Sequence, residues 1–187
     1  MWWPENPVRR RVLRVAGALA LASLTAGCFQ PLYGDRSIGA SGDVRDKLAS
    51  VDVPPIDVPN GTSLARISVH MRNQLIFALT GGGAATNPAY HLVIHLSAQQ
   101  RQVVVDINTG RPEVVNYGLI ASYQMTEVAT GKQVINSTAY STVSYNIPGQ
   151  EQRFAGARGL RDAESRAADV IAQNIHARLA SYFVAGT

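Results

Sequence analysis

The only cysteine of the chain, Cys28, is the residue whose chemistry the sequence marks most clearly. One thiol cannot close an intramolecular disulfide, and without nearby cysteine or histidine residues it makes a poor metal site. Cys28 follows the most apolar stretch of the chain, in "LTAGCFQPLYG". It is therefore either an incidental small residue or a nucleophile whose sulfur is consumed in a covalent modification.

The segment before Cys28 has the layout of an export signal. Four arginines stand between residues 9 and 14, and residues 15–26 carry no charge. A helix of this apolar length reaches only about 18 Å, whereas a hydrocarbon core is about 30 Å thick. The sequence therefore predicts that residues 1–27 are a signal peptide and not a transmembrane anchor.

The residues at the end of this segment resemble a bacterial lipobox. Thr25, Ala26 and Gly27 are small and directly precede Cys28. The resemblance implies diacylglycerol on the Cys28 sulfur, cleavage before Cys28 and acylation of the new amino group. Several acyl chains hold a protein on a membrane far more firmly than one. The alternative is an ordinary secretory peptide followed by an incidental cysteine.

Removal of residues 1–27 changes the charge of the chain. The precursor has a net charge of +4, and the signal takes four arginines and Glu5 with it, which leaves +1 on 160 residues. The basic character thus belongs mostly to targeting and gives no reason to expect nucleic-acid binding. A chain of this length suits one domain. We expect a lipidated, flexible tether over residues 28–47 and a single domain over residues 48–187.

The pattern of apolar residues predicts an α+β fold. A short strand is expected within residues 48–58, a helix over residues 64–79, three strands near residues 90–98, 115–125 and 134–147, and a long helix over residues 154–183. Each amphipathic helix needs an apolar partner. We therefore expect a four-stranded, mostly antiparallel sheet with two helices packed on one face. In the last helix, Arg161, Glu164 and Arg166 are expected to lie off the apolar stripe.

The other face of the three long strands is polar but nearly uncharged. Hydroxyl, amide and imidazole side chains dominate it, with almost no Lys, Arg, Asp or Glu. An exposed face of an antiparallel sheet also alternates polar residues outward, but it usually carries more charge. This face is therefore either an interface with another polar surface or an ordinary solvated face.

No pattern in the sequence indicates an enzyme. His91 and His95 would lie about 13 Å apart on a strand, too far for one metal ion. No serine stands in a G-x-S-x-G motif. We expect no catalytic residue, no metal and no cofactor apart from the covalent lipid on Cys28.

Three basic residues are candidate contacts for an anionic lipid headgroup. Arg101, Arg111 and Lys132 stand at or near predicted turns and strand ends, and guanidinium groups pair well with phosphate. The alternative is that they are simply surface charges. Successive turns of a meander fall at opposite ends, so Arg111 and Lys132 are not expected to form one patch.

Three features together resemble the LPS-assembly lipoprotein family LptE in its alphaproteobacterial form. They are the lipobox continuing as "CFQPLYG", the order strand–helix–three strands–helix, and the final helix "LRDAESRAADVIAQNIHARLASYF". The resemblance spans residues 28–183, and residues 28–34 carry its most specific part.

The resemblance implies an outer-membrane lipoprotein on the periplasmic side that plugs the lumen of an LptD-like β-barrel. It also implies participation in lipopolysaccharide transport to the outer leaflet. Phe29, rather than aspartate, follows the cysteine, which favours export to the outer membrane. The alternative is an auxiliary lipid-binding lipoprotein of an envelope ABC-type lipid transporter.

Overall fold

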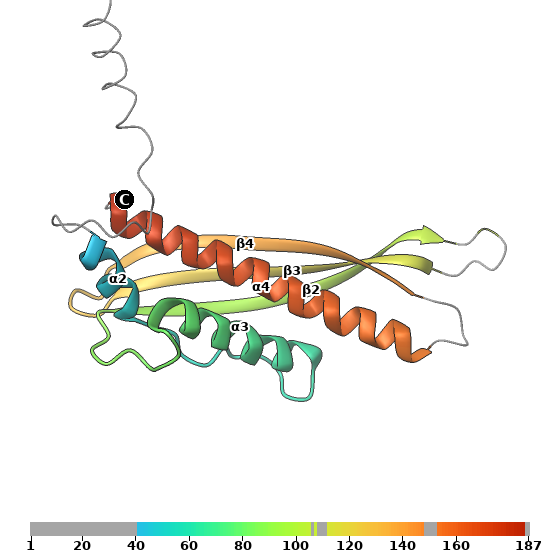
Figure 1. Ribbon diagram of the computed structural model, residues 1–187, viewed down its shortest axis with the longest axis horizontal. Coiled ribbons are helices and arrows are strands. Elements are labelled where there is room, and N and C mark those ends of the chain that lie inside the picture. The colour runs from blue at the N-terminus through green and yellow to red at the C-terminus, as the bar shows by residue number, and fades with distance from the viewer. Residues whose placement is uncertain (1–40, 106, 108–111, 148–152, 186–187) are drawn as a thin grey trace, which may run out of the picture.

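The computed structural model describes residues 41–105, 107, 112–147 and 153–185. Along the chain, the elements are α2 (Ser41–Ala49), β1 (Val51–Asp52), α3 (Ser63–Thr80), β2 (Tyr90–Val105), β3 (Pro112–Glu127), β4 (Gln133–Asn146) and α4 (Arg153–Ala185) (Figure 1). Apart from α2, this is the predicted order. None of the helices in the described ranges has an apolar stretch long enough to cross a membrane.

The sheet confirms the predicted fold class. Its strand order is β1-β2-β3-β4, and β2, β3 and β4 pair antiparallel. Both β2 and β3 have 16 residues and β4 has 14, so β2 and β3 extend well beyond their predicted windows. Most of the extra length comes from the ends of β2 and β3 near the 106–111 segment, where mutual pairing continues as far as Val105↔Pro112.

The first strand differs from the other three. It has two residues, and it runs parallel to β2, with Val51 opposite Tyr90 and Asp52 opposite His91. A crossover through α3 returns the chain to the same end of the sheet, and this connection gives a parallel pair. Pro54 follows closely, and proline lacks the N–H needed to continue the ladder.

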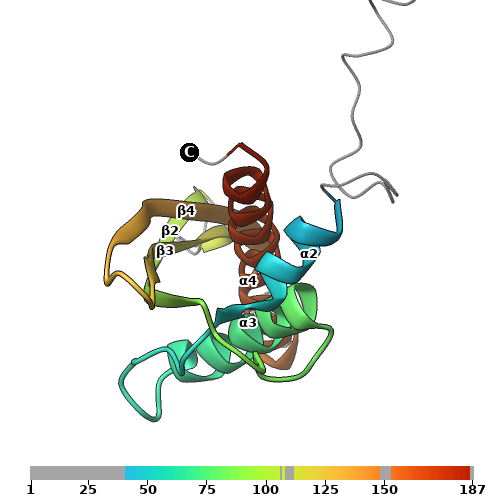
Figure 2. The same ribbon diagram turned by 90° about the vertical axis from the view of Figure 1, so that its left-hand side faces the viewer.

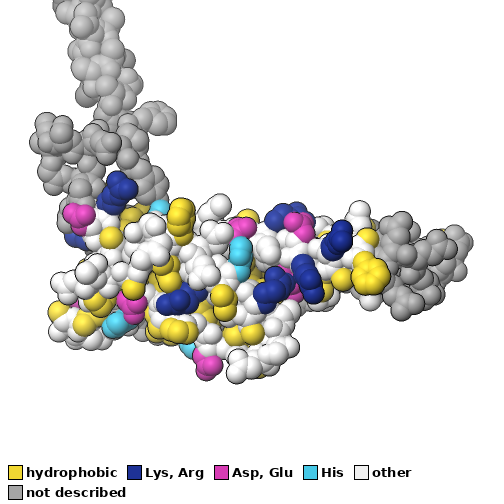
Figure 3. Space-filling view, turned by 60° about the horizontal axis from the view of Figure 1, so that its bottom comes forward, with side chains coloured by type: hydrophobic (Ala, Val, Ile, Leu, Met, Phe, Trp, Pro, Cys, Tyr) yellow, Lys and Arg dark blue, Asp and Glu magenta, His cyan; other side chains and the backbone are white. Residues whose placement is uncertain are grey.

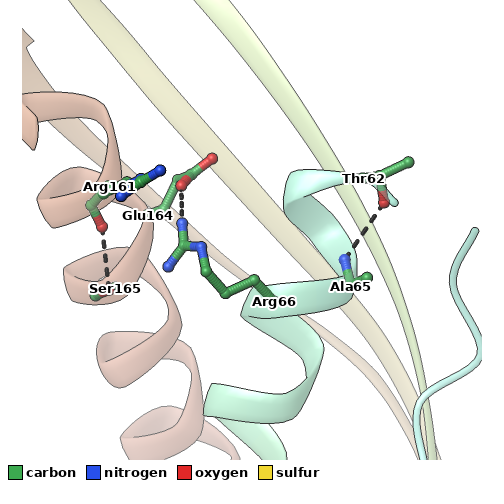
Figure 4. A network of polar contacts seen from close by, with 6 residues as sticks. All are labelled: Thr62, Ala65, Arg66, Arg161, Glu164 and Ser165. Carbon is green, nitrogen blue, oxygen red and sulfur yellow. Dashed lines mark hydrogen bonds and ion pairs between the residues drawn. The ribbon is translucent and has the colours of Figure 1, made fainter. Parts of the chain in front are cut away.

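The ends of α3 follow from local chemistry. The Thr62 hydroxyl accepts a hydrogen bond of 3.3 Å from the backbone N–H of Ala65, which caps the amino end (Figure 4). Gly81 has φ 82°, a left-handed conformation that glycine adopts without strain, and its N–H donates to the Phe77 carbonyl at 3.0 Å. The predicted helix over residues 64–79 is confirmed.

Both long helices cover the same face of the sheet (Figure 2). Between the layers lies one core, whose most deeply buried side chains include Ile67, Met71, Leu75, Leu92, Tyr117, Leu119, Met125, Ile171, Ile175 and Leu179. The buried stripe of α4 is rich in alanine (Ala163, Ala167, Ala168, Ala172 and Ala180). Small side chains let this helix lie close to its neighbours, which accounts for a tight core despite few large residues on α4.

Helix α2 occupies part of the segment expected to be a tether. Val44 packs against the core and Leu48 is buried in it. Burial of these two apolar side chains stabilises the short helix, which its polar composition alone would not do. Helix α2 begins at Ser41, and residues 28–40 of the expected tether lie outside the described ranges.

Candidate interaction face on the open side of the sheet

The face of β2, β3 and β4 that points away from α3 and α4 is called the open face here. Its residues are His91, Val93, His95, Ser97, Gln99 and Arg101 of β2; Asn116, Gly118, Ile120, Ser122, Gln124 and Thr126 of β3; and Asn136, Thr138, Tyr140, Thr142, Ser144 and Asn146 of β4. All are exposed or partly exposed except Gly118. The polar parity predicted from the sequence is therefore confirmed as the uncovered side (Figure 2).

The register arranges the open face in cross-strand rows of three. One row is His95–Ser122–Thr138, and in it the two hydroxyls lie 3.4 Å apart. In the last complete row, which contains Arg101, the Ser144 hydroxyl donates to Asn116 Oδ1 at 2.7 Å. Such pairs stabilise neighbouring strands modestly and leave most amide and hydroxyl groups free for another surface.

The middle rows contain the apolar part of the open face. Ile120 lies between Ser97 and Tyr140, and the Tyr140 side chain is 74% exposed. In the adjacent row, a Cβ built on Gly118 would lie 3.1 Å from Gln99 Cγ, so the Gln99 side chain lies over the glycine. An exposed tyrosine with an apolar neighbour is typical of the anchor residues of protein interfaces.

Charge is nearly absent from the described open face. Arg101 carries the one formal charge among its residues. The surface on the α3 side of the domain differs from the open face, because basic and acidic side chains are scattered over it among hydrophobic ones (Figure 3). The neutrality is therefore a property of the open face of β2, β3 and β4, and it does not follow from the average composition.

The structure separates the three basic candidates. Arg101 is exposed on β2 opposite Asn116, whereas Lys132 is exposed in the β3–β4 turn. About eleven residue positions along β3 lie between them, which corresponds to about 36 Å. Arg111 lies outside the described residues. One headgroup therefore cannot contact Arg101 and Lys132 together.

The two histidines of β2 lie apart as expected for a strand. His91 Nδ1 lies 3.1 Å from Asp52 Oδ2, at the end of the sheet where β1 pairs. His95 lies two cross-strand rows farther along β2, with the Val93 row between them. In the part of the chain that the structure describes, no three potential ligand residues gather as a metal site.

A polar cluster lies between the two long helices and the covered face of the sheet. Glu164 on α4 is 2% exposed and forms an ion pair with Arg66 of α3 (Figure 4). Beneath them, burial and the Glu164 carboxylate raise the pKa of Tyr117 to about 12, and the same two causes raise the pKa of Tyr145. The Tyr145 hydroxyl donates to Gln100 Oε1 at 3.2 Å.

Sequence reasoning missed this cluster. Glu164 was expected off the apolar stripe of α4, but it faces the core; Val170, an apolar residue at helical spacing, is 43% exposed. The sequence offered only a weak signal, namely that Glu164 directly follows Ala163 of the apolar stripe. The structure shows that both residues are buried. The partner of Glu164 stands 98 residues away, so no local pattern reveals the pair.

The residues predicted for lipid attachment and signal cleavage lie outside the described ranges. These are Cys28 and the preceding Thr25, Ala26 and Gly27. The structure therefore leaves the covalent lipid and the signal peptide as predictions from the sequence.

Known structures share this fold. A candidate lipoprotein from Caulobacter crescentus CB15 superposes with a TM-score of 0.58 at 21% identity, covering 78% of this chain and 98% of that one. The solution structure of uncharacterized lipoprotein B from Nitrosomonas europaea gives a TM-score of 0.53 at 15% identity, covering 82% of this chain and 94% of that one. At these identities the likeness establishes the fold alone.

The family is established by the sequence of the domain. No curated protein sequence matches this chain. The family model described as "LptE: Lipopolysaccharide-assembly" matches residues 48–179, which run from α2 through most of α4. This match confirms the family that the sequence resembles. The chain belongs to the LptE family of lipopolysaccharide-assembly proteins.

Proposed function

We propose that this protein is an outer-membrane lipoprotein that lodges within an LptD-like β-barrel and takes part in delivering lipopolysaccharide to the outer leaflet. Acyl chains on Cys28 would hold it at the periplasmic side of the membrane, because several chains together give stable anchoring. The domain would act as plug and assembly partner. No chemical step is assigned to it, and it needs no cofactor.

The observation that supports this proposal is the neutrality of the open face. The interior of an outer-membrane barrel is polar. A face of hydroxyl and amide side chains can exchange hydrogen bonds with such a wall without leaving a charge desolvated and unpaired. With Tyr140 as an exposed anchor, the open face has the composition expected of a surface that lies against the lumen.

A contact with lipopolysaccharide phosphate is proposed for Arg101 individually. It is an exposed guanidinium within an otherwise uncharged surface. Guanidinium binds phosphate oxygens through two parallel hydrogen bonds. Lys132, at the other end of the sheet, would have to contact a different part of the glycolipid or another group.

The partner can be identified by affinity purification from detergent-solubilised outer membranes, with mass spectrometry of the bound proteins. We expect a large outer-membrane β-barrel in the complex. Recovery of an inner-membrane ATPase system in its place would contradict the proposal and favour the auxiliary role in lipid transport.

The anchor is tested by Cys28→Ala. Without the thiol, no diacylglycerol can be attached, so we expect an unlipidated, uncleaved precursor and a reduced amount of assembled barrel. Metabolic labelling with palmitate and membrane fractionation would measure both effects. Processing and fractionation indistinguishable from wild type would show that Cys28 is not the lipid attachment site.

A further inference from the structure

Strand β4 forms one border of the sheet, and at its far end α4 comes close to this border, because a Cβ built on Gly159 would lie 3.4 Å from the Asn146 carbonyl oxygen. Strand β4 pairs with β3 on one side, and within the described residues no strand pairs with its other side. The register with β3 runs without a bulge from Val114↔Asn146 to Met125↔Ile135. A long, regular border strand presents a row of unpaired N–H and C=O groups to any extended chain that approaches it.

The β3–β4 turn shows which backbone groups are unpaired. Glu127 donates its N–H to the Lys132 carbonyl at 2.9 Å and accepts from the N–H of Gly131 at 2.9 Å, so both its backbone groups point toward β4. The next residue, Val128, donates to the Ala89 carbonyl beside β2 at 2.9 Å. Successive residues of an antiparallel strand direct their backbone groups to opposite sides. Odd-numbered residues of β3 therefore bond to β4, and even-numbered ones bond to β2.

The register transfers this alternation to β4. Odd-numbered residues of β3 pair with odd-numbered residues of β4, as in Ala121↔Ala139. The even-numbered residues of β4 consequently point their N–H and C=O groups away from β3; they are Asn136, Thr138, Tyr140, Thr142 and Ser144. Among the described residues, no backbone hydrogen bond outside the ladder reaches these groups.

The sequence of β4 lacks the features that protect a border strand. From Gln133 to Asn146 it contains no Lys, Arg, Asp, Glu, Pro or Gly. Border strands of soluble sheets are usually interrupted by such residues, because these prevent pairing with other chains. The opposite border, β2, carries Arg101 and is covered at its start by β1. The uninterrupted β-forming sequence of β4 is therefore suited to pairing.

A groove lies beside the far end of this border. It has a volume of about 420 Å³ and is lined by Ser144, Tyr145 and Asn146 of β4 together with Ala155, Gly159, Asp162 and Arg166 of α4. In it, Arg166 Nε donates to Asp162 Oδ2 at 2.8 Å, and both side chains are more than half exposed. A strand added beside β4 would direct alternate side chains toward this groove. A polar side chain there could contact both Asp162 and Arg166.

We propose that β4 accepts an extended segment of the barrel partner as an additional strand of the sheet, with a polar side chain of that segment in the groove. The proposal rests on the proposed barrel partnership and names the element that makes the contact. Main-chain hydrogen bonds from the even-numbered residues of β4 supply the affinity, and the groove supplies the specificity. The added strand continues the open face, so edge and face form one interface.

A second copy of this chain fits the border less well. In a two-fold pairing centred on Tyr140, the residue opposite Tyr145 would be Ile135 of the second copy. Ile135 is 4% exposed in its own core and cannot turn into the groove without leaving it. The groove would then stay unfilled. A segment of the barrel has no such constraint.

Amide hydrogen exchange tests the proposal directly. The full-length lipoprotein alone in detergent is compared with its complex purified from outer membranes, with residue-resolved readout by fragmentation mass spectrometry. We expect exchange at Thr138, Tyr140 and Thr142 to slow by about tenfold or more in the complex. The inward N–H groups of Ala139 and Ser141, already in the ladder, serve as internal controls that are slow in both states.

Three other outcomes of the exchange experiment would contradict strand addition by the barrel. If a barrel is bound but the even-numbered amides exchange as fast as in the free protein, strand addition is wrong and the barrel partnership stands. If no barrel is recovered, both proposals fail. If these amides become protected in the barrel-free protein as its concentration rises, a second copy is the occupant and the proposal is overturned.

A pair of variants at Thr142 gives an independent test. Thr142→Pro removes a backbone N–H that points away from β3 and makes no hydrogen bond within the sheet. Thr142→Val changes the same side chain but retains this N–H. Provided circular dichroism shows both variants folded, we expect the proline variant to recover about tenfold less barrel than the valine variant. Equal recovery would overturn strand addition. If the proline variant does not fold, the exchange measurement decides.

Discussion

The two faces of the same three strands have opposite chemistry. The face under α3 and α4 contains large apolar side chains such as Leu119 and Met125, both fully buried. The open face, one residue away along each strand, carries hydroxyls, amides and a single arginine. Because alternate residues of a strand point to opposite faces, neighbouring positions lie in different environments. The covered face determines stability, and the open face is available for binding.

The largest difference between the faces should be seen in unfolding. Leu119→Ala removes a fully buried side chain, and we expect a loss of about 2–5 kcal/mol in the free energy of unfolding. Ser122→Ala on the open face should change it by less than about 0.5 kcal/mol. Equilibrium urea unfolding followed by circular dichroism measures both. Similar losses in the two variants would mean that the open face is part of a core.

Binding should show the reverse sensitivity. Tyr140→Ala on the open face should reduce recovery of the barrel by about tenfold or more, since exposed aromatic anchors commonly contribute about 2 kcal/mol to an interface. Phe77→Ala is the matched control, because Phe77 is 66% exposed but lies on α3 on the other side of the domain. Pull-down yields at equal expression compare them. An equal effect of the two changes would remove the reason to assign the interface to the open face.

The smallest expected effect concerns pH and the covered face. Burial, followed by the Glu164 carboxylate, raises the pKa of Tyr117 from 10.0 to about 12, so the folded state holds this proton more tightly than the unfolded state. Its contribution to stability is complete below pH 10 and is lost as pH rises through 12.

We therefore expect wild type to lose about 1 kcal/mol more than Tyr117→Phe between pH 8 and pH 11, as measured by urea unfolding at the two values. At pH 8 the variant should be as stable as wild type or slightly more so, because the Tyr117 hydroxyl has no hydrogen-bond partner among the described residues. An identical pH dependence in the two proteins would show that Tyr117 is not the titrating group.

Much of the architecture could be predicted because apolar residues recur at the short spacings typical of strands and helices. Alternation of apolar residues located β2, β3 and β4, and helical spacing of apolar residues located α3. The same alternation identified the open face as the polar, nearly uncharged side of these strands. The short α2 was missed because its polar, glycine-containing sequence has little helical preference, and it is stabilised by docking of Val44 and Leu48.

By itself, then, the sequence determined the strand and helix pattern, the neutrality of the open face and the candidate lipid attachment at Cys28. Only the tertiary structure decided the parallel pairing of β1, the burial of Glu164 against Arg66 and the outward direction of the backbone groups of β4. The physical reason is that these features depend on which distant segments meet. Local periodicity specifies the face on which a side chain lies, whereas pairing and burial are set by partners many residues away.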